Sequence, residues 1–277
     1  MSATVHLTAV VSPGAELGEG TDVGPYAVIE NDVVIGSRSR IGSHAVIREF
    51  TRMASDNHVF EHAVIGGTPQ DFAYHGARSS VRIGSGNLFR EGVTVHRATT
   101  PGGETAIGDN NYLMVNAHVA HDCVLGDNIV LANNVTLAGH VTIEDRAFLS
   151  GGVGVHQFVR LGAHSMTGGH SKITQDVLPY ALVDGAPARV RGLNLVGLRR
   201  GGFSSSEISD LKRAFRILFD AGSPLARRLS DMEEIPSPHV SHLVTFVRNS
   251  KRSFHVRKNG RVTGSRAPGA RPESADH

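Results

Sequence analysis

The stretch VIENDVVIGSRSRIGSHAVI, residues 28–47, places an isoleucine at every sixth position. The same phase of large apolar residues begins at Val5, and two polar insertions, TPQDFAYHGARSS and RATTPGGETA, interrupt it. It returns at Ile83, and after the second insertion it runs from Ile107 to Ile173. Glycine often follows the apolar residue, and a small residue often lies two places before it. The sequence is therefore dominated by one six-residue repeat.

A period of six excludes an amphipathic helix, whose apolar positions recur with a period of 3.6. It is typical of short strands joined by tight corners, with one aliphatic side chain per strand pointing inward and glycine or asparagine at the bends. Three such strands close a triangular coil of about 18 residues, and successive coils stack at the ~4.8 Å spacing of paired strands. Chance alternation in a β-sandwich would not keep one phase for so long. The sequence predicts an all-β parallel β-helix over residues 1–192.

The pattern becomes helical after the repeat. SSSEISDLKRAFRILFDAG (204–222) offers serines for an N-cap, an apolar face and a glycine as a stop. Further helices are expected within LARRLSDM (225–232) and SPHVSHLVTFVRNS (237–250), the latter with proline near its start. We therefore expect a small α-helical C-terminal domain over residues 193–256. Residues 257–277 are polar and rich in glycine and proline, and we expect a disordered tail there.

The composition favours a cytoplasmic protein. No apolar run reaches the ~18 residues of a membrane span, and the first residues do not resemble a signal peptide. A single cysteine, Cys123, excludes an internal disulfide framework. Residues 1–190 carry 12 lysines and arginines against 18 aspartates and glutamates, whereas residues 191–277 carry 16 against 8. We expect an acidic partner for this basic C-terminal part, and neither a nucleic-acid partner nor a transmembrane segment.

The coil length converts sequence spacing into geometry, because residues 18 apart lie above one another. His121, Gly139 and Gln157 then form one column, and Asp122 and His140 form the next. A neutral imidazole can remove a proton from a hydroxyl group, and a carboxylate on its other nitrogen fixes the tautomer. A glycine N–H that no side chain covers can stabilise an oxyanion. These columns predict a catalytic site.

Histidines can also be inert surface residues or metal ligands. The chain has 16 histidines, and most surface histidines have no catalytic role. A histidine stack can bind a metal, as in β-helix carbonic anhydrases. His118, His121 and His140 lack the close pair and distant third ligand that such a site would need, so we expect neither a metal nor another cofactor. Cys123 lies in a small inward position and is interpreted as core filler.

Several long motifs resemble one enzyme family. They are NAHVAHDCVLGDNIVLANNVTLAGHV (116–141), GGVGVHQFVRLGAH (151–164), RGLNLVGLRRGGF (191–203), IGGTPQDFAYHG (65–76) and VTVHRATTPGG (93–103). They are similar to the cytoplasmic UDP-N-acetylglucosamine O-acyltransferases that begin lipid A synthesis. The resemblance implies a homotrimer of left-handed parallel β-helices with active sites between subunits. It also implies a 3-hydroxyacyl chain on acyl carrier protein as donor and UDP-N-acetylglucosamine as acceptor.

The resemblance assigns roles to individual residues. His121 would be the general base toward the glucosamine 3-hydroxyl, Asp122 would orient it, and the Gly139 N–H would stabilise the oxyanion. Further substrate-binding residues are implied: Asp71 toward the sugar hydroxyls, His96, His118, His140, His156 and Gln157 along the clefts, and Asn194 and Arg200 toward the nucleotide or pantetheine end.

One glycine in the pair after the VHQF motif acts as an acyl-chain ruler in this family. Here that position is Gly169, and its missing side chain implies a long donor of twelve to fourteen carbons. Met166 and His170 are neighbours that could set the length instead.

The chain departs from the family pattern at three points: Ala73 stands in place of a lysine, Gly201 stands in place of an arginine, and DGAPARVRG (184–192), with Pro187, replaces a histidine-containing loop. They put donor affinity and nucleotide contacts in doubt. The alternatives left open are a 3-amino acceptor, acetyl-CoA as donor, and the related N-acyltransferase, which usually carries a separate uridine-binding domain before its repeat. A non-catalytic β-helix would be expected to have regular threonine ladders, whereas these faces are irregular.

Overall fold

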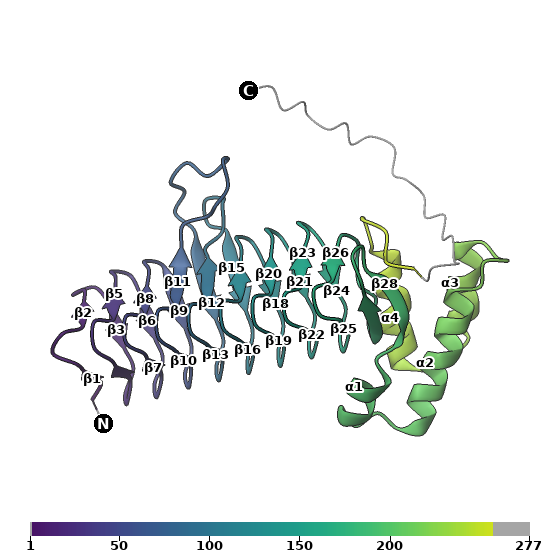
Figure 1. Ribbon diagram of the computed structural model, residues 1–277, viewed down its shortest axis with the longest axis horizontal. Helices are drawn as coiled ribbons and strands as arrows, with labels where there is room; N and C mark the ends of the chain where they lie inside the picture. Colours follow the sequence, from purple (N-terminus) through teal and green to yellow (C-terminus); the bar gives the residue numbers. More distant parts are fainter. Residues whose placement is uncertain (1, 257–277) are drawn as a thin grey trace.

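The computed structural model describes residues 2–256, and it shows a long left-handed β-helix followed by four helices (Figure 1). The strands form three sheets that are the sides of a triangular prism. The expected tail, residues 257–277, lies outside the described residues. No helix among residues 2–256 is both long and apolar enough to cross a membrane.

The first sheet has eleven strands, in the spatial order β1 (Thr4–Val5), β4 (Asp22–Val23), β7 (Arg40–Ile41), β10 (His58–Val59), β13 (Leu88–Phe89), β16 (Tyr112–Leu113), β19 (Val130–Leu131), β22 (Phe148–Leu149), β25 (Met166–Thr167), β27 (Ala181–Asp184) and β28 (Arg189–Leu193). The second has nine, β2 (Val10–Val11), β5 (Val28–Ile29), β8 (Val46–Ile47), β11 (Val64–Gly67), β14 (Thr94–His96), β17 (His118–Val119), β20 (Thr136–Leu137), β23 (Gly154–Val155) and β26 (Lys172–Ile173). The third has eight, β3 (Glu16–Leu17), β6 (Val34–Ile35), β9 (Thr51–Met53), β12 (Ser80–Ile83), β15 (Glu104–Ile107), β18 (Val124–Leu125), β21 (Thr142–Ile143) and β24 (Arg160–Leu161).

The strand register confirms the 18-residue coil, since Val11 pairs with Ile29 and Ile29 pairs with Ile47 in parallel strands. The side chains of Ile29 and Ile47 are completely buried, and they belong to an aliphatic column that fills the prism. Burying a side chain of this size contributes about 1.5–3 kcal/mol. The repeat of apolar residues therefore specifies both the coil and its core.

The two insertions lengthen two successive coils at one edge of the prism. The first lies between β11 and β12 and projects from the prism (Figure 1), and the second lies between β14 and β15. Both occupy the turn from the second sheet to the third, which is the same edge that carries residues 121–122, 139–140 and 157–158 in the following coils. We call this edge the histidine corner.

The bends differ from expectation. Left-handed backbone is adopted there by histidine, aspartate, arginine and phenylalanine as well as asparagine, including Asp122 (φ +59°) and His140 (φ +60°). This conformation costs a residue with a Cβ about 1–2 kcal/mol. Hydrogen bonds between successive corners offset part of this cost, as where the His140 N–H donates to the carbonyl oxygen of His121 at 3.0 Å.

Four helices follow the prism: α1 (Leu195–Arg200), α2 (Ser205–Leu218), α3 (Leu225–Glu233) and α4 (Pro238–Arg248). Helix α2 begins with a reciprocal capping box between Ser204 and Glu207, and it ends four residues before the expected glycine stop, Gly222. Helix α4 has the expected proline in its first turn. The sequence pattern did not predict α1, which is a single short helix of six residues.

Candidate active site

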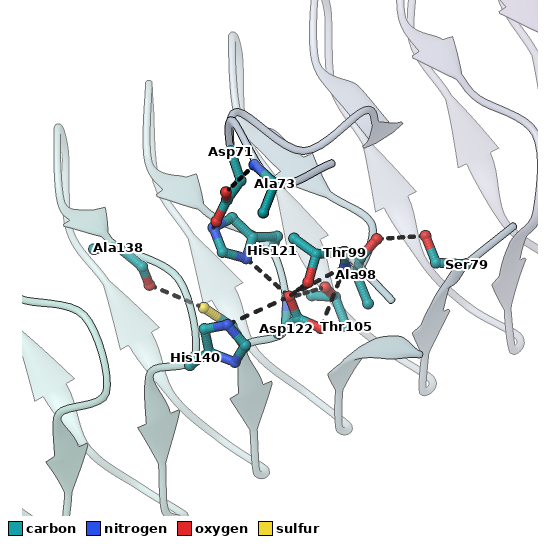
Figure 2. A network of polar contacts seen from close by, with 11 residues as sticks. Asp71, Ala73, Ser79, Ala98, Thr99, Thr105, His121, Asp122, Ala138 and His140 are labelled. Atoms are coloured by element: carbon teal, nitrogen blue, oxygen red, sulfur yellow. Dashed lines mark hydrogen bonds and ion pairs between the residues drawn. The ribbon is translucent and has the colours of Figure 1, made fainter. Parts of the chain in front are cut away.

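The catalytic histidine proposed from the sequence lies directly beside its aspartate. The Nδ1 atom of His121 is 2.8 Å from Oδ2 of Asp122 (Figure 2). Because an ionised carboxylate only accepts hydrogen bonds, Nδ1 carries the shared proton. In the neutral ring, Nε2 is then the unprotonated nitrogen. The pair provides a base of fixed orientation.

Asp122 is itself held by further hydrogen bonds. The backbone N–H and the hydroxyl of Thr99 donate to its carboxylate at 3.1 and 2.8 Å, and the Asp122 N–H donates to the Thr105 hydroxyl at 2.8 Å (Figure 2). Burial acts to raise the pKa of Asp122, but the hydrogen bonds from His121 and Thr99 outweigh it, so the pKa lies below its ordinary value. Asp122 therefore stays ionised at neutral pH.

The first insertion places a second carboxylate on the opposite side of the imidazole. Oδ2 of Asp71 is 3.4 Å from Nε2 of His121, and Oδ1 of Asp71 accepts the Ala73 N–H at 2.8 Å (Figure 2). His121 is consequently only 5 % exposed, although it lies outside the prism. A hydroxyl group bound to the side of this pair would be within reach of both Nε2 and the Asp71 carboxylate. Asp71 and His121 are separated by 50 positions in sequence.

Gly139 lies against the flat face of the His121 ring. A Cβ atom at this position would be 2.3 Å from Cε1 and 2.5 Å from Nε2 of that ring, so only glycine fits. The ladder leaves the first residue of each corner without a backbone partner for its N–H, and Pro13 and Pro25 occupy equivalent positions. Within residues 2–256 the Gly139 N–H makes no hydrogen bond. It is a donor beside the imidazole of His121.

His140 completes the corner. Its ring meets that of His121 edge-on with centroids 5.2 Å apart, and it stacks on Phe158 at 4.6 Å. His121, Asp122 and His140 bring ligand-type atoms within 4.8 Å of one another, an arrangement that could hold a metal. However, Oδ2 of Asp122 already accepts hydrogen bonds from His121 and Thr99, which a metal would have to displace. The contacts suit a base assembly better than a metal centre.

Two further histidines, His96 in β14 and His118 in β17, lie close enough to His121 for their charges to interact with it. Burial, followed by repulsion from His118 and His121, lowers the pKa of His96 to about 4. Burial also lowers the pKa of His118, whose Nδ1 is 2.7 Å from the Thr94 hydroxyl. The rings of His96 and His118 meet edge-on at 5.0 Å. At neutral pH both rings can offer hydrogen bonds without adding positive charge.

A hollow of about 600 Å³ opens beside these groups on the outer face of the second sheet. We call it the first hollow. Polar and apolar residues of four successive coils line it, together with residues 70–72 of the first insertion. Its lining includes Gln70, Asp71, Phe72, His118, His121, Gly139, His156, Gln157 and Lys172. The structure thus brings together most of the residues proposed from the sequence. It adds Lys172, and the carboxylate contacts add Thr99, neither of which the sequence pattern had indicated.

Five of the proposed residues neither line the first hollow nor contact the histidines beside it. The Asn194 amide caps α1 by accepting the Gly197 N–H at 3.0 Å, and it donates to the carbonyl oxygen of His164 at 2.9 Å. Arg200 is exposed at the end of that helix. Of the other three, Met166 lies in strand β25 of the first sheet, and Gly169 and His170 lie at the edge that follows it.

The space around the proposed ruler is open. A Cβ atom on Gly169 would have a single neighbour outside its own segment, the carbonyl oxygen of Gly151 at 3.6 Å. The ring of His170 lies against Gly152, where an added Cβ atom would be 2.5 Å from Nδ1.

The chain matches two family models. Residues 176–255 match the model described as "Udp N-acetylglucosamine O-acyltransferase; Domain 2", and residues 14–49 and 104–139 match "Bacterial transferase hexapeptide (six repeats)". The model of the second domain begins within the last coil of the β-helix.

Named relatives cover nearly all of the chain. It is 47 % identical over 249 residues to an acyl-[acyl-carrier-protein]–UDP-N-acetylglucosamine O-acyltransferase of Alkalilimnicola ehrlichii, with 89 % of this chain and 96 % of the relative covered. It is 42 % identical over 255 residues to the enzyme of the same name from Thiobacillus denitrificans, with 91 % and 99 % covered. The solved UDP-N-acetylglucosamine acyltransferase of Francisella novicida superposes with a TM-score of 0.90 at 35 % identity, covering 92 % and 95 % of the two chains.

Proposed function

This chain belongs to the family of acyl-[acyl-carrier-protein]–UDP-N-acetylglucosamine O-acyltransferases, and we propose that it catalyses their reaction with His121 as the general base. The enzyme transfers an acyl chain from acyl carrier protein to UDP-N-acetylglucosamine, the first step of lipid A biosynthesis. The acyl chain we propose is 3-hydroxylated, and the acceptor atom is the 3-hydroxyl oxygen of the glucosamine. The observation that carries the mechanism is the 2.8 Å contact between His121 Nδ1 and Asp122 beside the free N–H of Gly139.

The reaction can be written as acyl transfer through a tetrahedral intermediate. Nε2 of His121 takes the proton of the 3-hydroxyl as that oxygen attacks the thioester carbon. The carbonyl oxygen becomes an oxyanion and accepts a hydrogen bond from the Gly139 N–H. The C–S bond then breaks, and His121 returns the proton to the departing thiolate. Asp122 stays ionised and stabilises the imidazolium between the two proton transfers.

The acceptor sugar is proposed to bind in the first hollow between His121 and Asp71. The 3.4 Å separation of Nε2 and the Asp71 carboxylate supports this, because a sugar hydroxyl bound there can donate to one while it contacts the other. The neutral rings of His96 and His118, together with His140, His156 and Gln157, would line the sugar and acyl-chain paths. Neutral histidines discriminate among hydroxyl groups by hydrogen bonding rather than by charge.

A homotrimer with shared sites is proposed for the assembly. Arg200 lies in α1 beyond the prism, and Gly169 lies at the edge between the first and second sheets, so neither is at the histidine corner. A neighbouring subunit is therefore the proposed source of such contacts at the site. The first sheet also exposes apolar side chains that a neighbouring subunit could cover, including Leu88 and Phe148, each 37 % exposed. Asn194 would act through Arg200, because its amide is engaged in capping α1. A protein that is monomeric by light scattering and fully active at the same concentration would refute the shared site.

We propose that the protein is cytoplasmic, which is supported by the buried free thiol of Cys123 and by the acyl carrier protein in the relatives' names. The deciding experiment mixes purified protein with UDP-N-acetylglucosamine and 3-hydroxyacyl-acyl carrier protein and identifies the product by mass. An ester on the 3-hydroxyl supports the proposal. Product from acetyl-CoA alone, or only from a 3-amino UDP-sugar, would replace it with one of the other acyl transfers.

A further inference from the structure

A second hollow, with a volume of about 510 Å³, lies on the other flank of the histidine corner. The first hollow is lined by Gly139 and Gln157, whereas the second is lined by the next residue in each case, His140 and Phe158. The two spaces are therefore lined by directly adjacent residues of the corner backbone. His140 also connects the second hollow to the base assembly, because its Nε2 is 3.7 Å from Oδ2 of Asp122.

The second hollow is rich in positive charge. Arg160, Lys251 and Arg252 contribute to its lining. The one carboxyl group in that lining belongs to Asp176, which is 1 % exposed and whose oxygens accept the Arg160 N–H at 2.9 Å and the Ser250 hydroxyl at 2.7 Å. The lining therefore carries three cationic side chains against one carboxyl group. Arg160 has a partial counter-ion in Glu144, whose carboxylate is 3.7 Å away and is also 3.0 Å from Nε2 of His242. The charge balance of the hollow favours an anion.

The cations from the C-terminal segment are held in place on both sides. Before them, the Ser250 hydroxyl donates to the Asp176 carboxylate at 2.7 Å. After them, the N–H of the buried His255 donates to the Asp176 carbonyl oxygen at 3.0 Å. Arg252 in addition donates to the carbonyl oxygen of Gln157, the residue that lines the first hollow. These anchors distinguish the cluster from mobile surface charges.

We propose that the second hollow is an anion subsite that binds a phosphate ester of one of the two substrates. The inference rests on the proposed acyl transfer, in which the donor arm carries a phosphodiester and the acceptor carries a diphosphate. A phosphate oxygen can accept charge-assisted hydrogen bonds from guanidinium and ammonium groups, and an arginine fork can bind two oxygens at once. The substrate would reach around the histidine corner, with its reacting end in the first hollow and its phosphate in the second.

The test separates the two sources of phosphate by comparing donors. Arg160→Ala, Lys251→Ala and the double variant are assayed against 3-hydroxyacyl-phosphopantetheine, against 3-hydroxyacyl-pantetheine without phosphate, and against varied UDP-N-acetylglucosamine. Arg227→Ala, which removes an exposed cation on α3, is the control. We expect kcat/KM to fall about tenfold per lost cation for the substrate whose phosphate binds there, corresponding to about 1.4 kcal/mol. The fall is in KM, with kcat retained.

The outcomes are distinct. A loss with the phosphorylated donor that is absent with acyl-pantetheine assigns the subsite to the phosphate of the donor arm, and a loss confined to UDP-N-acetylglucosamine assigns it to the diphosphate. Unchanged kcat/KM for both substrates overturns the proposal. A second measurement is independent of turnover: inorganic phosphate should raise the Tm of the unmodified protein more than that of the Lys251→Ala variant at equal ionic strength. If the unmodified protein yields no product with any donor, the proposed function fails, and this thermal measurement still decides the anion subsite.

Discussion

Replacing Gly139 with alanine tests how closely catalysis depends on the position of the His121 ring. The new Cβ atom would be 2.3 Å from Cε1 and 2.5 Å from Nε2, whereas carbon atoms in contact lie about 3.5 Å or more apart. The ring must therefore move by roughly 1 Å, away from its 2.8 Å contact with Asp122. A misplacement of this size can lower the rate about 10²-fold. We expect kcat to fall by about that factor.

The fold should tolerate this substitution, because Gly139 does not adopt the left-handed backbone that disfavours alanine. Steady-state kinetics with acyl carrier protein thioester and UDP-N-acetylglucosamine, combined with a thermal melt, separate loss of catalysis from loss of structure. Gly222→Ala is the matched control, since its Cβ atom would be no closer than 3.4 Å to any neighbour and the residue lies outside the β-helix. A Gly139→Ala protein with near-normal kcat would refute the idea that this glycine fixes the base.

Three further predictions concern the base, the acyl chain and acid stability. His121→Ala should lower kcat by about 10²–10⁴-fold with an unchanged melting curve. Asp122→Asn should lower kcat less, because control of the tautomer is only part of the effect. Equal turnover by the unmodified protein and both variants would rule out His121 as the base. Gly169→Met should shift preference in a donor series toward shorter chains, since each buried methylene contributes ~0.8 kcal/mol, and a preference for ten carbons in the unmodified protein would assign the ruler elsewhere. Burial lowers the pKa of His96 and of His255 to about 4. In the unfolded chain these groups bind protons from about pH 6.5 downward, so stability should fall from pH 6.5 to 4. Urea unfolding midpoints should show this fall and a flatter profile for His255→Gln, and an identical slope in that variant would contradict it.

Sequence spacing predicted the β-helix because a single physical rule applies throughout the repeat. Every coil of 18 residues returns an aliphatic side chain to the same side of the core, so Ile29 and Ile47 are paired in the structure as the periodicity requires. The same rule placed Gly139 against His121 and His140 near Asp122. These contacts join residues of uninterrupted coils, where counting is sufficient.

The contacts that counting did not provide involve the two insertions. Thr99 donates to Asp122 from 23 positions earlier, and Asp71 approaches His121 from 50 positions earlier. Neither separation is a multiple of 18, because Val59 pairs with Phe89, 30 residues on, and Phe89 pairs with Leu113, 24 residues on. The resemblance to a family supplied Asp71, whereas Thr99 had no signal in the sequence. Helix α1 was missed because it is short and depends on the Asn194 cap.

The arrangement of the insertions suggests how a repetitive scaffold acquires a catalytic centre. The repeat alone gives every corner the same backbone and an outward-facing side chain, which water would surround. Two insertions at successive coils of one corner bring Asp71 and Thr99 beside the pair that the next coil presents, and His121 becomes 5 % exposed without leaving the outside of the prism. Burial strengthens the electrostatic contacts of Asp122, and the rigid ladder below fixes their geometry. The proposed catalytic residues are therefore concentrated at the corner where the period is broken, because the insertions bring residues of other coils against His121 and Asp122 there.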